Sequence, residues 1–510
     1  MFHVGKNTIE NALDVDIAVS DKMFNAMTLW ESVYKGYAPW IDNENVFSCN
    51  LAAQISSEFA RMATIENTID VTGSPRADYL DECLNNLRQN LRVQTEYGCA
   101  WGNLILKPCI TGNTLTVDYV KPNAFFPIAF DCSGRITEIV FLDQATVGST
   151  IYNKLEHHTL KNDTVTVKNR VFKSNFSGDL GDEVDIRSVE AWQHLKPVTV
   201  IANISQPLYG YFKVPMANQI DEYSPLGVSV FSRAITQIKH ADEQYGRFLW
   251  EFEGSELAID AGGPLFLKDE HGKEILPTGR DRLFRFYPQA EKNFINCYSP
   301  PIREQSQIAG LNELKKQIED LCHLARGSIS SPDSEAKTAT ELKILRQRSY
   351  ATVTDIQKAL QFALDDLIYA MDVFTTLYNL APSGDYNTTY HWDDSIITDE
   401  DALRAQRMQE VSSGLMPKWE YRMLTRGEDE ATAKAMVEQE TITFGMEDSL
   451  QDSTVDVQGK ALNGAQTQSL IAIMAQYSAK EITEGQAINL ISTAIGIEKD
   501  EARRILNGEL

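Results

Sequence analysis

The sequence of 510 residues has few of the features that mark membrane, secreted or DNA-coating proteins. Its longest apolar runs, such as 360–371, are broken by Asp or Gln well before the roughly 20 residues that a membrane span needs. No basic stretch followed by an apolar core occurs near Met1, so no signal peptide is expected and the chain is expected to arise in a cytosol. Basic residues are also scarce, because 47 Lys and Arg stand against 72 Asp and Glu. The resulting net charge of −25 disfavours tight nucleic-acid binding by phosphate neutralisation.

The acidity leaves two interpretations open. One is an ordinary soluble acidic protein of the cytoplasm, and the other is a surface that polyanions pass without sticking. The seven cysteines are scattered and include no C-x-x-C pair, so their spacing predicts neither a disulfide framework nor a zinc site. Single buried thiols in a reducing compartment fit this spacing better.

The sequence also lacks the common catalytic motifs. It contains no G-x-x-x-x-G-K-[ST], G-x-S-x-G, H-E-x-x-H or G-x-G-x-x-G. His157 and His158 are adjacent and would point to opposite faces of a strand, which favours a solvated strand end over a metal site. Asp393 and Asp394 fit an acidic loop before a helix better than a two-carboxylate metal site. We therefore expect no enzyme, and no catalytic, cofactor-binding or metal-binding residues.

The composition is that of a globular protein, and the apolar pattern predicts helices and strands in a definite order along the chain. The length and the hydrophobic fraction of 43% predict two to four packed domains. Apolar residues at helical spacing predict helices over 47–66 and 74–98. Alternating segments separated by turn residues then predict a β-rich meander over 100–175. The fold class expected is α+β and predominantly helical.

Long helices dominate the second half of the sequence. Apolar stripes predict helices over 227–252 and 304–325, which flank strand-like pieces and turns over 255–303. A Gly/Ser/Pro-rich break at 327–332 precedes a third predicted helix over 338–378, about 60 Å long at 1.5 Å per residue. From 398 onward the pattern is helical and acidic, with glycines that punctuate short helices.

Seven segments, in this order, resemble one family. They are 45–62, Glu96-Tyr97-Gly98-Cys99-Ala100-Trp101-Gly102, Lys121-Pro122-Asn123-Ala124-Phe125-Phe126-Pro127, Leu155-Glu156-His157-His158, Pro225-Leu226-Gly227-Val228-Ser229, Ile238-Lys239-His240-Ala241-Asp242-Glu243 and Lys337-Thr338-Ala339-Thr340-Glu341-Leu342. Together they resemble the portal proteins of long-tailed double-stranded DNA bacteriophages and prophages, in the branch common in Gram-positive hosts. The resemblance covers roughly residues 45–440, and the first 45 and last 60 residues lie outside it.

The resemblance implies a portal-type fold that assembles as a ring, usually a homo-oligomer of twelve, at the portal vertex of a virion capsid formed in the host cytoplasm. Double-stranded DNA would pass through the channel without sequence specificity during packaging and ejection. The large terminase subunit, a head–tail adaptor, and the major capsid and scaffolding proteins are the implied partners, with no membrane. The implied division is 1–45 as an N-terminal arm, 46–226 and 341–400 as the wing, 227–253 and 304–326 as stem helices, 254–303 as the clip, 327–340 as the tunnel loop and 401–510 as the helical crown or C-terminal region.

Candidate site residues follow from this division. The stem residues expected to pack are Ile308, Leu311, Leu314 and Ile318. The candidates for loose contact with DNA phosphates, at the channel and tunnel loop, are Arg326, Ser330, Ser331, Lys337 and Lys343. The candidates for terminase or adaptor contact in the clip are Lys268, Asp269, Glu270 and Lys273.

Alternatives remain open at this stage. Arg326 and Lys343 would serve equally well to neutralise helix ends or to pair with Glu335 and Glu341. The turn 269–273 fits a plain solvated hairpin as well as a docking contact. A capsid-associated structural protein other than the portal, or an unrecognised cytoplasmic hydrolase with a convergent polar pocket, would be the competing functions.

Overall fold

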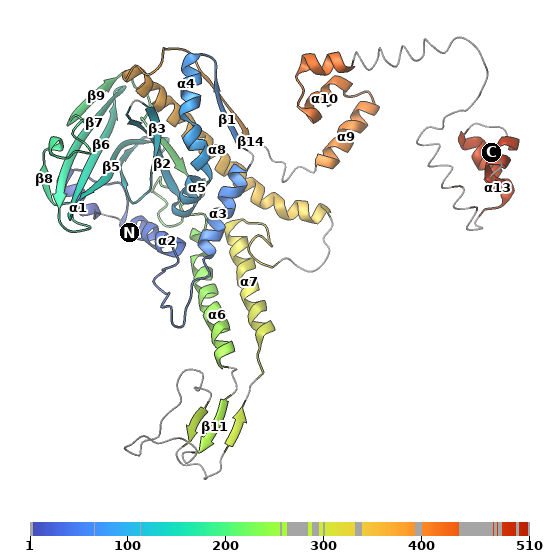
Figure 1. The fold of residues 1–510 in the computed structure, drawn as a ribbon, viewed down its shortest axis with the longest axis horizontal. Coiled ribbons are helices and arrows are strands. Elements are labelled where there is room, and N and C mark those ends of the chain that lie inside the picture. Colours follow the sequence, from blue (N-terminus) through green and yellow to red (C-terminus); the bar gives the residue numbers. More distant parts are fainter. Residues whose placement is uncertain are drawn as a thin grey trace. The chain divides into compact units, whose positions relative to one another are not determined.

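The structure is a computed structural model of the chain, and it divides into two units, Met1–Asp399 and Glu400–Leu510. The residues described are 4–65, 67–112, 114–254, 258–262, 284–287, 295–298, 301–331, 339–392, 400–437, 473, 477, 482–495 and 499–507. For 258–262, 284–287, 295–298 and 339–348 only the course of the backbone is described. The mixture of helices and sheets confirms the α+β class (Figure 1).

Five helices open the first unit. They are α1 (Lys6–Leu13), α2 (Asp21–Tyr34), α3 (Leu51–Thr64), α4 (Pro75–Cys83) and α5 (Asn85–Trp101). Ser74 caps α4 by accepting the Ala77 N–H at 3.4 Å, and Pro75 occupies the first turn. The single helix predicted over 74–98 is therefore two helices that meet at Leu84. The residues expected as an N-terminal arm supply α1 and α2, and Met23 and Trp30 of α2 are buried in the main core.

Two antiparallel sheets form the β-rich part. The smaller has the order β10-β2-β3, and the larger β4-β5-β6-β7-β8, with β9 also paired to β7. Their bounds are β2 (Asn103–Thr111), β3 (Thr114–Val120), β4 (Phe125–Phe130), β5 (Ile136–Val147), β6 (Thr150–Lys161), β7 (Thr164–Ser174), β8 (Asp182–Val184), β9 (Val198–Ala202) and β10 (Gly210–Lys213). The meander predicted over 100–175 is confirmed, and the chain adds β8, β9 and β10 after it.

The long helix α8 (Ala339–Leu377) packs against α3 and the smaller sheet. Leu360, Leu364 and Leu367 of α8 are buried in the same core as α3 and α5. At Gly210 of β10 a Cβ atom would lie 2.0 Å from the Ala363 carbonyl oxygen, so only glycine permits this approach of strand and helix. Beside α4, β1 (Asn67–Thr72) pairs antiparallel with β14 (Asn387–Trp392), which joins segments more than 300 residues apart.

A hairpin of two long helices extends from the first unit (Figure 1). It consists of α6 (Ile235–Gly254) and α7 (Glu304–Cys322). Their apolar stripes predicted both helices, but the one predicted over 227–252 begins only at Ile235, after a 3-10 turn over Ser232–Ala234. Between the two helices lie β11 (Ala258–Gly262), β12 (Phe284–Tyr287) and β13 (Ile295–Tyr298), in the order β12-β11-β13. Because β11 follows α6 directly and β13 precedes α7, this small sheet lies at the far end of the hairpin.

The second unit shows only helices among its described residues. They include α9 (Glu400–Ser412), α10 (Lys418–Arg426), α13 (Glu484–Ile495) and α14 (Lys499–Asn507). Ile488, Ile491 and Leu506 form a small buried cluster between α13 and α14. This agrees with the helical pattern expected after 398. None of the described helices in either unit combines the length and the apolar character that crossing a membrane would require.

Candidate functional site

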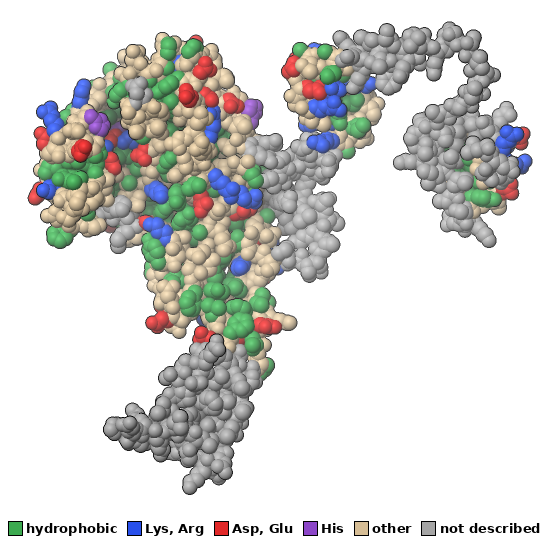
Figure 2. All heavy atoms as spheres, viewed as in Figure 1, with side chains coloured by type: hydrophobic (Ala, Val, Ile, Leu, Met, Phe, Trp, Pro, Cys, Tyr) green, Lys and Arg blue, Asp and Glu red, His purple; other side chains and the backbone are tan. Residues whose placement is uncertain are grey.

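The far half of the α6–α7 hairpin exposes large apolar side chains. Trp250 is 65% exposed and Ile308 is 52% exposed. Ile308 belongs to the apolar stripe of α7 that continues into the core. We call four residues the distal stem patch: Trp250, Phe252, Ile302 and Ile308. Figure 2 shows hydrophobic side chains gathered on this part of the hairpin. Exposed apolar side chains grouped in this way mark surfaces that bind another protein.

Polar contacts set the two helices antiparallel. Glu251 of α6 receives the Arg303 guanidinium at 3.0 and 2.8 Å and the Arg303 backbone N–H at 3.2 Å. One to two turns closer to the body, the Gln244 amide donates to Gln307. The hydrogen bonds from Arg303 hold the pKa of Glu251 below its usual range. The hairpin therefore carries its own side-chain links near its far end.

The near end of α6 is fastened to the segment that precedes α3. The Asp242 carboxylate is 2% exposed and accepts the Trp40 Nε1–H at 2.9 Å and the Cys49 N–H at 2.7 Å. Burial raises the pKa of Asp242, against the lowering effect of these two donors. At Gly246 a Cβ atom would lie 1.9 Å from the Asn45 carbonyl oxygen, so the chain crosses α6 in direct contact. The hairpin is thus held rigidly where it leaves the body.

The four predicted stem residues divide between two environments. Ile318 is fully buried in the core of its own chain, and Leu311 and Leu314 pack against that core. Ile308 alone of the four is largely exposed. Ile318 therefore packs within its own chain, and packing of these stem residues against a neighbouring subunit stays a prediction.

The first part of the predicted tunnel loop is folded onto α7. Ser330 is 6% exposed, and its hydroxyl donates to the Glu319 carboxylate at 2.8 Å. Ser330 is therefore not available to a phosphate, which corrects its place among the DNA-contact candidates. Ser331 is exposed, and its backbone N–H donates to Asn312 Oδ1 at 2.7 Å. Arg326 is half exposed and pairs with Asp320 at 2.7 Å. Glu335, the partner considered from the sequence, lies outside the described residues.

The remaining candidates lie largely beyond the described residues. Lys337 lies outside them, and Lys343 lies on α8 where only the backbone is described. The four clip candidates, Lys268, Asp269, Glu270 and Lys273, also lie outside the described residues, as does the acidic pair Asp393 and Asp394. Their roles stay predictions.

Sequence reasoning missed a buried ionic network centred on Glu156 of β6. Its carboxylate receives Lys107 Nζ at 2.6 Å and Lys154 Nζ at 3.2 Å, and it contacts His158 Nε2 at 2.7 Å. Lys107 comes from β2, so the network joins the two sheets. His158 is 6% exposed, which overturns the expectation of a solvated strand end, whereas His157 contacts Glu138 at 2.8 Å. The two histidines contact different carboxylates, Glu138 and Glu156.

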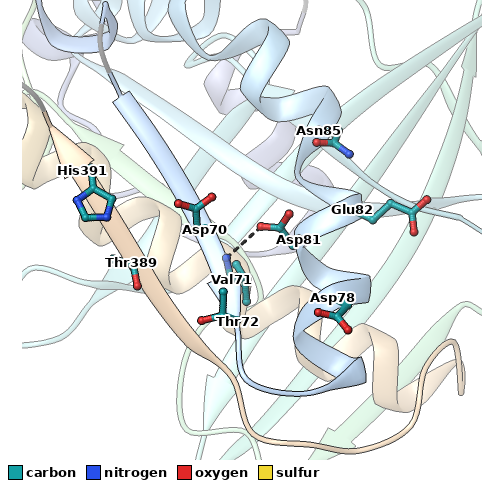
Figure 3. Close-up of a pocket in the computed structure, with 9 residues that line it drawn as sticks. All are labelled: Asp70, Val71, Thr72, Asp78, Asp81, Glu82, Asn85, Thr389 and His391. Atoms are coloured by element: carbon teal, nitrogen blue, oxygen red, sulfur yellow. Dashed lines mark hydrogen bonds between the residues drawn. The ribbon is translucent and has the colours of Figure 1, made fainter. Parts of the chain in front are cut away.

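A hollow of about 590 Å³ lies between the β1–β14 pair and α4 (Figure 3). Asp81, one of its four carboxylates, accepts the Val71 N–H at 3.0 Å and pairs with Arg88. Glu82 points away from the strands in Figure 3, and among the described contacts His391 bonds to no other lining residue. No group of three residues suited to holding a metal occurs in the described part of the chain. Of the four carboxylates in the lining, Asp81 is therefore already occupied by contacts within the protein.

Comparisons with known proteins give little. No protein-family model matches the chain, and no curated protein matches it. Among solved structures it is similar to a chain of the structure described as "Neck of native GTA particle computed with C12 symmetry". The identity is 11%, the match covers 82% of this chain and 98% of that one, and the TM-score is 0.39. A likeness at this TM-score carries no conclusion about the role of the chain.

Proposed function

We propose that the chain is the subunit of a portal-type ring, which forms the channel for double-stranded DNA in the head of a tailed phage. The observation that carries this proposal is the distal stem patch on a helical hairpin with a small sheet at its tip. The ordered sequence resemblance over 45–440 supports the same assignment. The ring, usually of twelve copies, would dock a terminase during packaging and a head–tail adaptor afterwards.

The distal stem patch supplies a reason to assemble. Trp250 leaves 65% of its side chain in water, about 160 Å² if a Trp side chain offers about 250 Å². Covering that area would be worth about 4 kcal/mol before the costs of association. In a head-to-tail contact, the distal stem patch of one hairpin would meet a different surface of the next subunit, and the contact gives a ring when the rotation between subunits closes.

The channel side of the proposal rests on charge. A net charge of −25 per chain gives a ring that repels DNA over most of its surface. Arg326, Lys337, Lys343 and the exposed Ser331 remain the proposed loose phosphate contacts. Contacts to phosphates carry no base information, so DNA would pass without sequence specificity. Replacing Arg326 and Lys337 by alanine should change DNA retention most at low salt.

The clip is proposed to dock the packaging motor and then the adaptor. Its sheet lies at the tip of the hairpin, and the candidate contacts are Lys268, Asp269, Glu270 and Lys273. Scrambling 269–273 should impair motor docking and leave ring formation unchanged. Packaging at the normal rate by the scrambled protein would remove this contact from the proposal.

The test of assembly compares surface variants of the purified full chain on a sizing column. The double variant Trp250→Ser and Ile308→Ser should shift the protein from ring to smaller species. Val147→Ser, at a residue 62% exposed on the larger sheet, is the matched control and should leave the ring intact. Circular dichroism should show native helix content in all three proteins. Equal ring yields from the double variant and the control would contradict the proposed stem interface.

A further inference from the structure

The chain that follows α7 turns back along the helix it has just left. Helix α7 ends at Cys322, because His323 takes a left-handed conformation with φ of 61°. The Leu324 N–H then donates to the Glu319 carbonyl at 2.9 Å, which closes the last turn. Gly327, with φ of +93°, allows a second change of direction that a side chain would oppose.

Glu319 is the centre of the contacts that fix this segment. Its side chain is fully buried, and its carboxylate accepts the N–H groups of Gly327 at 3.1 Å, Ile329 at 2.7 Å and Ser330 at 2.8 Å. The Ser330 hydroxyl is a fourth donor. Within the described part of the chain no lysine or arginine forms an ion pair with Glu319. The four donors therefore compensate a buried charge that would otherwise be costly.

Asn312 extends the same attachment along α7. It precedes Glu319 by seven residues, about two helical turns, so both side chains lie on one face of the helix. Its Oδ1 accepts the Ser331 N–H at 2.7 Å. Seven residues at 1.5 Å each are about 10 Å, so the segment 327–331 runs back along α7 toward the clip.

We infer that Glu319 and Asn312 act as a loop clamp that fixes where the segment between α7 and α8 leaves the stem. Residues 327–331 are fixed to α7, and the last of these contacts joins Ser331 to Asn312. Any tilt or rotation of α7 would carry this departure point with it. Glu319 and Asn312 are positioning residues, since neither is proposed to touch DNA.

The role of the clamp in DNA handling rests on the proposed function. If α7 lines a channel, the clamp holds residues 327–331 along its wall and brings Ser331 nearer the clip than the end of the helix. Arg326 lies on the body side of the clamped segment. Loosening the clamp should then change DNA retention through the path of the loop, with the basic residues themselves untouched.

Hydrogen exchange of the full chain, followed by mass spectrometry, tests the clamp itself. Glu319→Ala should make the amides of Gly327, Ile329 and Ser330 exchange about tenfold to a hundredfold faster, because each loses a bond to a charged acceptor. Glu313→Ala, at an exposed carboxylate of the same helix, is the matched control and should leave these amides protected. Unchanged protection in Glu319→Ala would overturn the clamp.

A second variant guards against loss of folding in the first. Asn312→Ala removes one bond at a partly exposed position, and it should speed exchange at Ser331 while Ile329 stays protected. If the Ser331 amide exchanges at the same rate in Asn312→Ala and in the wild-type protein, Asn312 has no clamping role. The exchange measurement does not require an assembled ring. It therefore tests the clamp even if native mass spectrometry shows that the protein is a monomer and the proposed function is wrong. In intact rings, unchanged DNA retention by Asn312→Ala at every salt concentration would overturn the role of the clamp in DNA handling alone.

Discussion

Replacing Glu156 by alanine is expected to destabilise the first unit strongly. The change removes the carboxylate that Lys107 contacts at 2.6 Å and Lys154 at 3.2 Å, both from side chains at most 15% exposed. Lys154 keeps Asp143 at 3.3 Å, but Lys107 loses the only carboxylate with which the described structure pairs it. Removing one partner of a buried ion pair costs about 3 to 5 kcal/mol, because a buried charge is left without compensation.

The assay is urea unfolding followed by tryptophan fluorescence, since Trp192 and Trp101 lie in this unit. With a urea slope of about 3 kcal/mol/M, the midpoint should fall by about 1 M or more. Glu183→Ala is the matched control, because Glu183 pairs with Arg170 at 2.5 Å on the same sheet but is half exposed. An exposed pair of this kind contributes about 0 to 1 kcal/mol. Equal midpoints for Glu156→Ala and Glu183→Ala would refute the reasoning.

Three further predictions concern the same unit. Burial raises the pKa of Glu156, but Lys107, His158 and Lys154 outweigh burial and hold this pKa well below 4.5. Burial lowers the pKa of His158 below 6.5, although the contact with Glu156 acts in the opposite direction. Both groups bind protons more readily in the unfolded chain than in the folded one. The free energy of unfolding should therefore fall as the pH drops below about 6.5, because of His158, and again below about 4.5, because of Glu156. In a pH series of urea midpoints, Glu156→Gln should flatten the part below about 4.5. Gly210→Ala should cost about 3 kcal/mol through its clash with α8, whereas Gly310→Ala, whose Cβ would meet nothing closer than 4.0 Å, should stabilise α7 by about 0.5 to 1 kcal/mol in the same assay. Asp242→Ala should leave Trp40 Nε1 and the Cys49 N–H without an acceptor and lower the melting temperature, and an unchanged melting temperature would contradict the attachment described for the stem.

Local patterns predicted most of the elements with bounds near those observed. The stripes that gave α6, α7 and α8 and the alternation that gave β2 to β7 are properties of neighbouring residues, which is why they can be read without a structure. The break at Leu84 was missed because the apolar spacing runs on across it. The pairing of β1 with β14 was missed because its partner lies more than 300 residues away, where short-range patterns carry no information.

The candidate site was predicted less well, for a related reason. A stripe identifies the apolar face of a helix but not the part that its own chain covers, so Ile318 and Ile308 look alike in sequence although one is buried and the other exposed. The Gly/Ser-rich segment after α7 suggested a free loop. Composition does not show that the Glu319 carboxylate accepts hydrogen bonds from the backbone N–H groups of that segment. The sequence did contain a signal for a buried carboxylate near this segment. Glu319 directly follows Ile318, which belongs to the apolar stripe, and lies eight residues before Gly327.

Native mass spectrometry of the purified full-length chain tests the central proposal most directly. A portal-type subunit should give a single closed species near twelve times 57.3 kDa, with a neighbouring ring size equally compatible with the stem contact. The double variant Trp250→Ser and Ile308→Ser should reduce that species in favour of the monomer. A wild-type protein that remains a stable monomer or dimer at every concentration measured would contradict the proposal.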